Sequence, residues 1–195
     1  MLMKDRRVRK TRKWLHEALI SLLLERNYDT LTIQQILDRA NVGRSTFYAH
    51  FKDKDELLLS GIHDFQSTLA SLHQREKASA EGHESFVAFS RAMFEHAYAY
   101  RDAYHALLNT QVWSRVRQSI QDSLTELIRQ ECKAEIPRLK DASSDVPVDL
   151  FVHVLVSTFM SVLTWWLDRR SRLSPQQINE VFRSLVLPSI NAALG

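Results

Sequence analysis

The chain has 195 residues, of which 45% are hydrophobic, so it can bury the core of one large domain or of a small domain joined to a larger one. Its single cysteine, Cys132, excludes a disulfide framework, and no CxxC or Cys/His cluster indicates a zinc site, so we expect neither a metal nor a cofactor. The start MLMKDRRVRK lacks the apolar stretch of a secretory signal, and we expect a cytoplasmic protein.

The positive charge is concentrated at the front of the chain. Residues 1–60 carry 12 Lys/Arg and 8 Asp/Glu, whereas the remainder carries 14 and 15. Such a basic segment suits a polyanion such as the DNA backbone, although a solvated terminus would have the same composition. Seven of these basic residues lie in the first 13 positions: Lys4, Arg6, Arg7, Arg9, Lys10, Arg12 and Lys13.

The sequence predicts an all-α fold. It has only four Gly and four Pro, and no alternating apolar runs between turn signals. Apolar residues at helical spacing predict a first helix over about 6–26 that ends at the NYDT turn. Thr32 is a good cap for a short second helix, TIQQILDRA, and Asn41 tolerates the left-handed backbone of a following turn.

Gly43 then begins a third helix, and Asp53 with Glu56 forms a variant capping box for a fourth. Two short helices joined by a tight turn predict a helix-turn-helix, whose third helix is shaped to enter a major groove. Its inward face is predicted to be Val42, Phe47 and Phe51, and its outward side chains have the chemistry to contact bases and phosphates. With the start of the fourth helix, these outward residues are Arg44, Ser45, Thr46, Tyr48, His50 and Lys54.

The stretch LTIQQILDRANVGRSTFYAHFKDKDELL resembles the DNA-binding segment of the tetracycline-repressor (TetR) family of bacterial regulators. The resemblance covers about the first 60 residues and implies a homodimeric, all-helical, ligand-responsive repressor that binds double-stranded DNA. It implies base or backbone contacts for Arg44, Ser45, Thr46, Tyr48 and His50, a phosphate contact for Lys54, and contacts from Thr32 and Gln34. Asn41 and Gly43 depart from the family pattern, where glycine and serine are common.

We therefore expect a helix-turn-helix domain over 1–58 and a helical effector-binding and dimerisation domain over 59–195. The fourth helix is predicted to continue through Leu72 and to break near ASAEGHE. Further helices are predicted from Phe86 to Tyr98, from Tyr104 to Leu108 and from Val112 to Ile128, followed by a polar loop over 134–147.

The segment VDLFVHVLVSTFMSVLTWWLDRR is apolar on nearly every face. Polar residues interrupt it and its length is near the lower limit for a membrane span, so we interpret it as a buried helix and expect no membrane contact. A last helix follows, capped by Ser174 with Pro175 at its first position. These two helices are predicted to pair with their copies in a dimer, although both could simply fill a monomer core. The predicted interface residues are Leu163, Trp166, Phe182, Leu185 and Val186.

Aromatic residues in the second half are candidates for a pocket that takes a small apolar or aromatic effector, although aromatic residues at helical spacing also form ordinary cores. The predicted pocket residues are Tyr98, Tyr104, Trp113, His153, Phe159 and Trp165. We do not expect an enzyme: Asp102 and His105 have metal-binding spacing but no second pair, and the chain lacks a glycine-rich phosphate loop and a GxSxG motif. A helical enzyme or a protein-binding adaptor with a vestigial helix-turn-helix remains the alternative.

Overall fold

The structure is a computed structural model that describes residues 2–78, 82–135, 146–168 and 171–194. The described residues form helices and no strand, which confirms the all-α prediction. In chain order the elements, with η for a 3₁₀ helix, are α1 (Leu2–Leu23), η1 (Tyr28–Thr30), α2 (Ile33–Ala40), α3 (Arg44–Tyr48), α4 (Lys54–Lys77), η2 (Gly82–Val87), α5 (Ser90–Ala99), α6 (Arg101–Leu107), α7 (Trp113–Glu135), α8 (Val148–Asp168) and α9 (Pro175–Leu194).

The helices form two compact units. The N-terminal unit comprises the residues up to Asp64 together with Asp102–Val116, and the C-terminal unit comprises Phe65–Arg101 and the described residues from Arg117 onward. The predicted domain boundary after residue 58 lies inside α4, whereas the compact units divide this helix after Asp64. Helix α6 and the start of α7 also join the N-terminal unit, a long-range association that no local sequence signal indicates.

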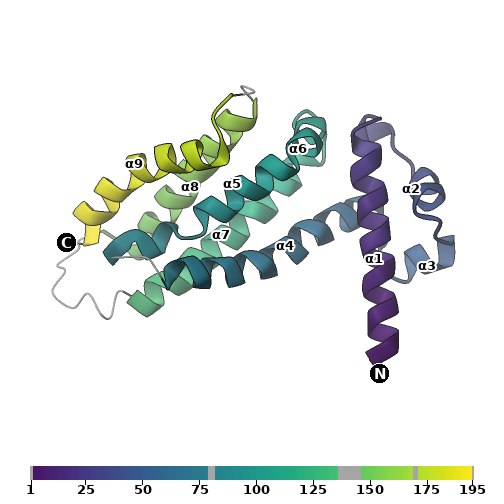
Figure 1. Cartoon of the computed structure of the whole chain (residues 1–195), viewed down its shortest axis with the longest axis horizontal. Helices are drawn as coiled ribbons and strands as arrows, with labels where there is room; N and C mark the ends of the chain where they lie inside the picture. Colours follow the sequence, from purple (N-terminus) through teal and green to yellow (C-terminus); the bar gives the residue numbers. More distant parts are fainter. Residues whose placement is uncertain (1, 79–81, 136–145, 169–170, 195) are drawn as a thin grey trace. The chain divides into compact units, whose positions relative to one another are not determined.

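In the N-terminal unit, α1 packs against α2, with α3 beside α2 (Figure 1). The core is made of leucines from α1 together with Ile36, Leu37 and Phe47, all buried. A bidentate ion pair at the rim joins α2 to the turn after α1: Arg39 donates to both carboxylate oxygens of Glu25, at 2.8 and 2.7 Å. Planar guanidinium and carboxylate groups match in this geometry.

Local capping positions α2 and the turn that follows it. The Thr32 hydroxyl accepts from the Gln35 backbone N–H at 3.3 Å, and the Gln35 side chain accepts from the Thr32 backbone N–H at 2.9 Å, a complete capping box. Asn41 ends α2 with φ 50° and ψ 49°, so the predicted left-handed residue is confirmed. The predicted cap at Asp53 is also confirmed, because its carboxylate accepts from the Glu56 N–H at 2.7 Å.

Close contact between α1 and α4 depends on Gly61. A Cβ added there would lie 2.9 Å from two atoms of the His16 ring, so a larger residue would displace the imidazole. The ring is held in place by Ser60, whose hydroxyl lies 3.0 Å from its Nε2 atom, and by an edge contact with Phe51. The glycine therefore lets α4 approach α1 closely at His16.

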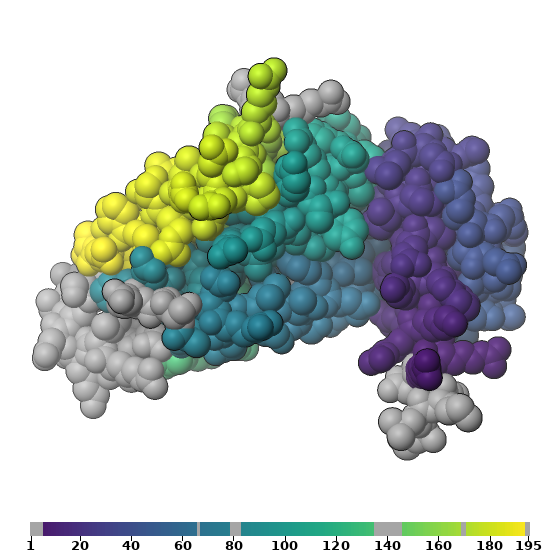
Figure 2. Space-filling model, in the orientation of Figure 1, coloured from purple at the N-terminus to yellow at the C-terminus, as the bar shows by residue number. Residues whose placement is uncertain are grey.

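In the C-terminal unit, α9 packs against α5 and α8, and Figure 2 shows α9 and α5 side by side on the visible face. An aromatic core joins these helices: Phe159 lies 5.1 Å from Phe89, 5.0 Å from Phe94 and 5.3 Å from Phe182 between ring centroids. These rings are fully buried. Most of the contacts are edge-on or tilted, the arrangement that aromatic quadrupoles favour.

Some predicted boundaries differ from the structure. The first helix begins at Leu2 rather than near Arg6, and the segment from Phe86 is divided into the 3₁₀ helix η2 and the α-helix α5. Periodicity does not separate these two helix types over so few residues. Of the predicted polar loop over 134–147, residues 136–145 lie outside the described part of the chain.

Helix α8 is long and apolar enough to cross a membrane by length and composition alone, and half of its most apolar window is buried inside the structure. Nine of its side chains are buried, including Phe159 and Trp166. The indole N–H of Trp166 donates to the Leu173 carbonyl at 3.0 Å, which satisfies its polar atom. This packing supports the interpretation of α8 as a core helix.

Candidate nucleic-acid interface

Helix α3 presents an exposed polar surface above a buried anchor. Phe47 is fully buried, and it contacts Phe51 at 5.8 Å and the Tyr48 ring at 5.4 Å between centroids. The side chains on the other faces are Arg44, Ser45, Thr46 and Tyr48, all exposed, with His50 half-buried next to Phe51. The core thus fixes the backbone of α3 while leaving the predicted reading groups open to solvent.

The helix is short, because it begins after Gly43 and ends at Tyr48. Gly43 provides no side-chain cap, and its φ of −70° does not require glycine. The Asn41 turn before it fixes the entry of α3, since the Val42 N–H donates to the Leu37 carbonyl at 3.1 Å. The orientation of α3 therefore depends on the preceding turn and on Phe47 rather than on a cap of its own.

The two predicted contacts on α2 are both exposed at its start. Thr32 uses its oxygen as an acceptor in the capping box, so its hydroxyl hydrogen remains available to a phosphate. Gln34 accepts from the Arg44 Nη2 at 2.9 Å and donates to the Asp38 carboxylate at 2.8 Å. Gln34 and Arg44 are thus in contact, which the sequence did not indicate.

Lys54 occupies a different environment from the one expected for a phosphate contact. Its ammonium donates to the carbonyls of Tyr28 at 2.6 Å, Leu31 at 2.8 Å and Asp29 at 3.3 Å, and it lies 4.6 Å from the centre of the Tyr28 ring. An ammonium has three N–H donors, so all of them have partners inside the chain. Lys54 therefore links the start of α4 to η1 through these hydrogen bonds.

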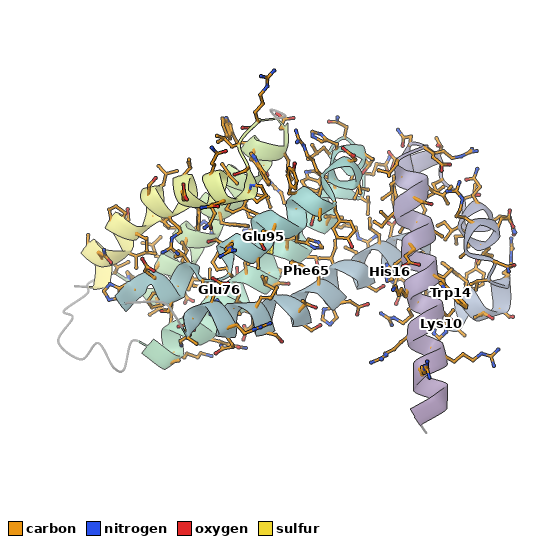
Figure 3. All side chains as sticks on the ribbon, in the orientation of Figure 1. Lys10, Trp14, His16, Phe65, Glu76 and Glu95 are labelled. Carbon is orange, nitrogen blue, oxygen red and sulfur yellow. The ribbon has the colours of Figure 1, made fainter. Side chains whose placement is uncertain are left out.

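The basic start of the chain continues α1 as a helix, whose first turns extend past α2 and α3 (Figure 1). Arg6, Arg7, Arg9, Lys10 and Lys13 are exposed, and the side chain of Lys4 lies outside the described residues. The Lys10 ammonium lies 4.9 Å from the centre of the Trp14 ring on the same helix (Figure 3). This end of α1 is a helical cationic arm, suited to phosphates.

Asp55 forms a polar cluster that the sequence reasoning missed. It accepts from the Tyr28 hydroxyl and from the Arg115 guanidinium, each at 2.6 Å. Burial raises the pKa of Tyr28 well above its usual value, and the hydrogen bond to Asp55 raises it further, so the phenol stays a donor. Sequence separation hides such a cluster, because Asp55 alone resembles an ordinary acidic residue of a first helical turn.

This geometry has counterparts among known proteins. A family model described as bacterial regulatory proteins, tetR family, matches residues 15–60, and one described as transcriptional regulator C-terminal region matches residues 84–187, more than half of the chain. The chain belongs to the TetR family of transcriptional regulators. The resemblance inferred from the first 60 residues is thereby confirmed.

Curated relatives match the DNA-binding segment of this TetR-family regulator. The uncharacterised HTH-type regulator YxbF of Bacillus subtilis is 44% identical over 59 residues, 30% of this chain and 16% of the relative. The HTH-type regulator TcmR of Streptomyces glaucescens is 32% identical over 74 residues, 37% of this chain and 33% of the relative. Each match thus spans a third or less of the relative's length.

Solved structures match nearly the whole fold. A TetR-family regulator structure from Syntrophomonas wolfei has a TM-score of 0.78 at 19% identity and covers 94% of this chain and 96% of that one. Thermus thermophilus FadR, a TetR-family repressor solved with lauroyl-CoA, has a TM-score of 0.64 at 20% identity and covers 90% and 93%. At these identities the likeness establishes the fold.

The predicted effector residues of the regulator are divided between its two units. Tyr104 and Trp113 belong to the N-terminal unit and contact each other edge-on at 6.4 Å. Phe159 is enclosed in the aromatic core of the C-terminal unit. The other three predicted residues, Tyr98, His153 and Trp165, are exposed. The sequence grouped them by aromatic character, which does not distinguish core from surface.

An open groove of about 420 Å³ lies elsewhere, on the N-terminal unit, with Trp14, Ser21 and Arg39 in its lining. None of its lining residues is a predicted effector contact. The described part of the regulator contains no group of three or more residues that could hold a metal ion. The Cys132 thiol is fully buried, and burial raises its pKa to about 11, so it is not a reactive thiolate.

Four of the five predicted interface residues are core residues of the regulator's own C-terminal unit. Leu163, Trp166, Phe182 and Val186 are buried within a single chain, and a side chain already enclosed there has no surface left for a partner. Leu185, by contrast, is 56% exposed. Both sides of α8 and α9 are apolar, so the sequence pattern does not separate the inward face from the outward one.

Proposed function

We propose that this TetR-family protein is a homodimeric repressor that binds a palindromic operator through α3 and leaves it when a small apolar or aromatic effector binds. The observation that carries the proposal is the exposed polar row of α3, anchored from below by the buried Phe47. A rigid helix with exposed donors is what direct readout in a major groove requires. We place the protein in the cytoplasm, where it has access to the DNA.

The side chains of α3 have distinct roles in this proposal. Arg44 donates two hydrogen bonds to a guanine edge, and Ser45 and Thr46 reach bases or phosphates. Tyr48 and His50 donate to phosphate oxygens, as the exposed start of α2 does. The arm at the start of α1 adds affinity that does not depend on sequence and weakens with salt.

Dimerisation supplies the second half-site, because one short recognition helix reads too few base pairs to select a single genomic site. The pairing surface we propose is the exposed apolar side of the last two helices. Leu150, Val154 and Trp165 lie on one face of α8, and Val181 and Leu185 lie one turn apart on α9. Burying these rows against a second copy removes apolar surface from water, the main favourable term in association.

An apolar effector is supported by the ligand named for one structural neighbour. Thermus thermophilus FadR was solved with lauroyl-CoA, a molecule with a long apolar chain. The interior of the C-terminal unit in this chain is aliphatic and aromatic, which suits a ligand of similar polarity. The effector acts by binding the free protein more tightly than the DNA-bound form.

The test is selection from a random double-stranded DNA library, followed by binding measurements on the enriched site. We expect a palindrome with half-sites one helical turn or a multiple apart. Arg44→Ala should cost about 1 to 3 kcal/mol on that site and relax preference at one position of each half-site. The matched control is Arg117→Ala, which removes the same charge from an exposed position on α7. Failure to enrich any sequence refutes the proposed function.

A further inference from the structure

A chain of hydrogen bonds joins α2 to the first residue of α3. The Gln34 Nε2 donates to the Asp38 Oδ1 at 2.8 Å, and the Gln34 Oε1 accepts from the Arg44 Nη2 at 2.9 Å. Gln34 and Asp38 are one helical turn apart on α2, and all three side chains are exposed. The three groups therefore lie on the surface that carries the reading side chains.

The chemistry of the three groups permits a single arrangement. A carboxylate only accepts and a guanidinium only donates, so the amide between them must point its nitrogen at Asp38 and its oxygen at Arg44. A Gln34 amide turned over would set its oxygen against the carboxylate and its nitrogen against the guanidinium. Asp38 therefore determines which end of the Gln34 amide faces Arg44.

We propose that Asp38 is a positioning residue for sequence readout, acting through Gln34 on the Arg44 guanidinium that faces a guanine edge. The inference rests on the proposed function, in which α3 enters the major groove. An unrestrained surface arginine has several rotamers, and ordering one of them on binding costs conformational entropy. Holding Arg44 by one N–H of Nη2 reduces that cost and leaves the second N–H of Nη2, together with Nη1 or Nε, to donate two hydrogen bonds to guanine.

The negative charge of Asp38 also affects binding to DNA of any sequence, and there its effect is unfavourable. A carboxylate beside the phosphate backbone repels it, so Asp38 weakens binding to every DNA sequence while sharpening the choice among them. Loss of Asp38 should therefore raise affinity for random DNA and lower discrimination at one base pair. Simple misfolding would lower both, and simple charge removal would raise affinity without changing discrimination.

The experiment measures binding of the full-length protein to three duplexes: the selected operator, the operator changed at the base pair that Arg44→Ala relaxes, and a random sequence. Discrimination is the ratio of the first two affinities. We expect Asp38→Ala to reduce discrimination about threefold to tenfold, the factor that corresponds to one immobilised side chain. Asp38→Asn keeps an oxygen that accepts from Gln34, so discrimination should stay within about twofold while random DNA binds more tightly.

A double-mutant cycle separates positioning from direct contact. If Asp38 acts through Arg44, then Asp38→Ala causes no further loss of discrimination in an Arg44→Ala background. Gln34→Ala should reproduce the loss of discrimination seen in Asp38→Ala but not the tighter binding to random DNA, because it keeps the Asp38 carboxylate. Circular dichroism reports whether each variant keeps its helices. Unchanged discrimination in folded Asp38→Ala, or an equal loss with and without Arg44, overturns the proposal.

The outcomes also separate this inference from the proposed function. If the unmodified protein selects no DNA sequence, the proposed function and the positioning role fail together. If it selects an operator and Arg44→Ala relaxes one position while Asp38→Ala does not, only the positioning role fails.

Discussion

Replacing Lys54 by methionine tests whether this residue acts inside the protein or on DNA. Methionine keeps most of the unbranched stem and removes the ammonium that donates to the carbonyls of Tyr28, Leu31 and Asp29. Two of these hydrogen bonds are short, at 2.6 and 2.8 Å, and partly buried. The variant removes the charged donor from all three carbonyls, of which only that of Tyr28 keeps a backbone partner, the Leu31 N–H at 3.1 Å.

The loss of folding stability expected for Lys54→Met follows from these hydrogen bonds. A hydrogen bond from a charged donor contributes about 1.5 to 3 kcal/mol, and partial access of water to the freed carbonyls reduces the loss from two such bonds. We therefore expect Lys54→Met to lower the free energy of unfolding by about 2 kcal/mol, measured by urea denaturation followed by circular dichroism. Lys52→Met, which removes the same charge from an exposed neighbour, should change it by less than about 0.5 kcal/mol.

The salt dependence of DNA binding completes this test. A lysine on a phosphate contributes about 0.9 to the slope of log affinity against log salt, whereas a lysine paired with carbonyls contributes almost nothing. We expect Lys54→Met to keep the slope of the unmodified protein at a temperature well below unfolding. A slope reduced by about one unit with unchanged stability would refute the reasoning and restore the phosphate contact.

Three further predictions concern packing, assembly and pH. Gly61→Ala should lower the free energy of unfolding by about 1 kcal/mol, because the clash with the His16 ring exceeds the gain in helix propensity, and urea titration checks it. Leu185→Arg should give folded monomers in sedimentation, whereas Phe182→Ala should cost about 3 to 5 kcal/mol of folding stability as a core truncation; a dimeric Leu185→Arg would exclude this face of α9. Burial lowers the pKa of His96 to about 4. As the pH is lowered from 6.5 to 4, the unfolded chain therefore takes up a proton that the folded chain does not, and the free energy of unfolding decreases. His96→Phe should reduce that fall by about 3 kcal/mol in urea titrations at several pH values, and an unchanged pH profile would contradict it.

Features set by neighbouring residues were predictable from the sequence. The caps at Thr32 and Ser174 are confirmed, and both are completed by a glutamine three residues later, which the local pattern contains. The left-handed residue at Asn41 follows from the tolerance of asparagine for positive φ. These features depend on contacts within four residues, where sequence spacing fixes distance.

Features set by distant residues were not predictable. Lys54 has the type and position of a phosphate contact, but its partners lie 23 to 26 residues earlier in the chain. The same limit applies to Phe182 and Leu185, which are neighbours on one apolar helix and yet are 0% and 56% exposed. Hydrophobicity predicts that both are buried, but only the packing of α9 against α5 and α8 determines which of them lies in the core of its own chain.

The unpredicted contacts of Arg44 and Lys54 both lie at or near α3, the helix proposed to contact DNA. A DNA-binding helix as short as α3 has too few turns to hold its own side chains, so neighbouring elements must supply the constraint. Phe47 fixes its backbone from below, and Gln34 restrains Arg44 from the side. Lys54 is also held by partners within the chain, the carbonyls of Tyr28, Asp29 and Leu31. Its contribution to the salt dependence of DNA binding decides whether it reaches a phosphate as well as supporting the helix.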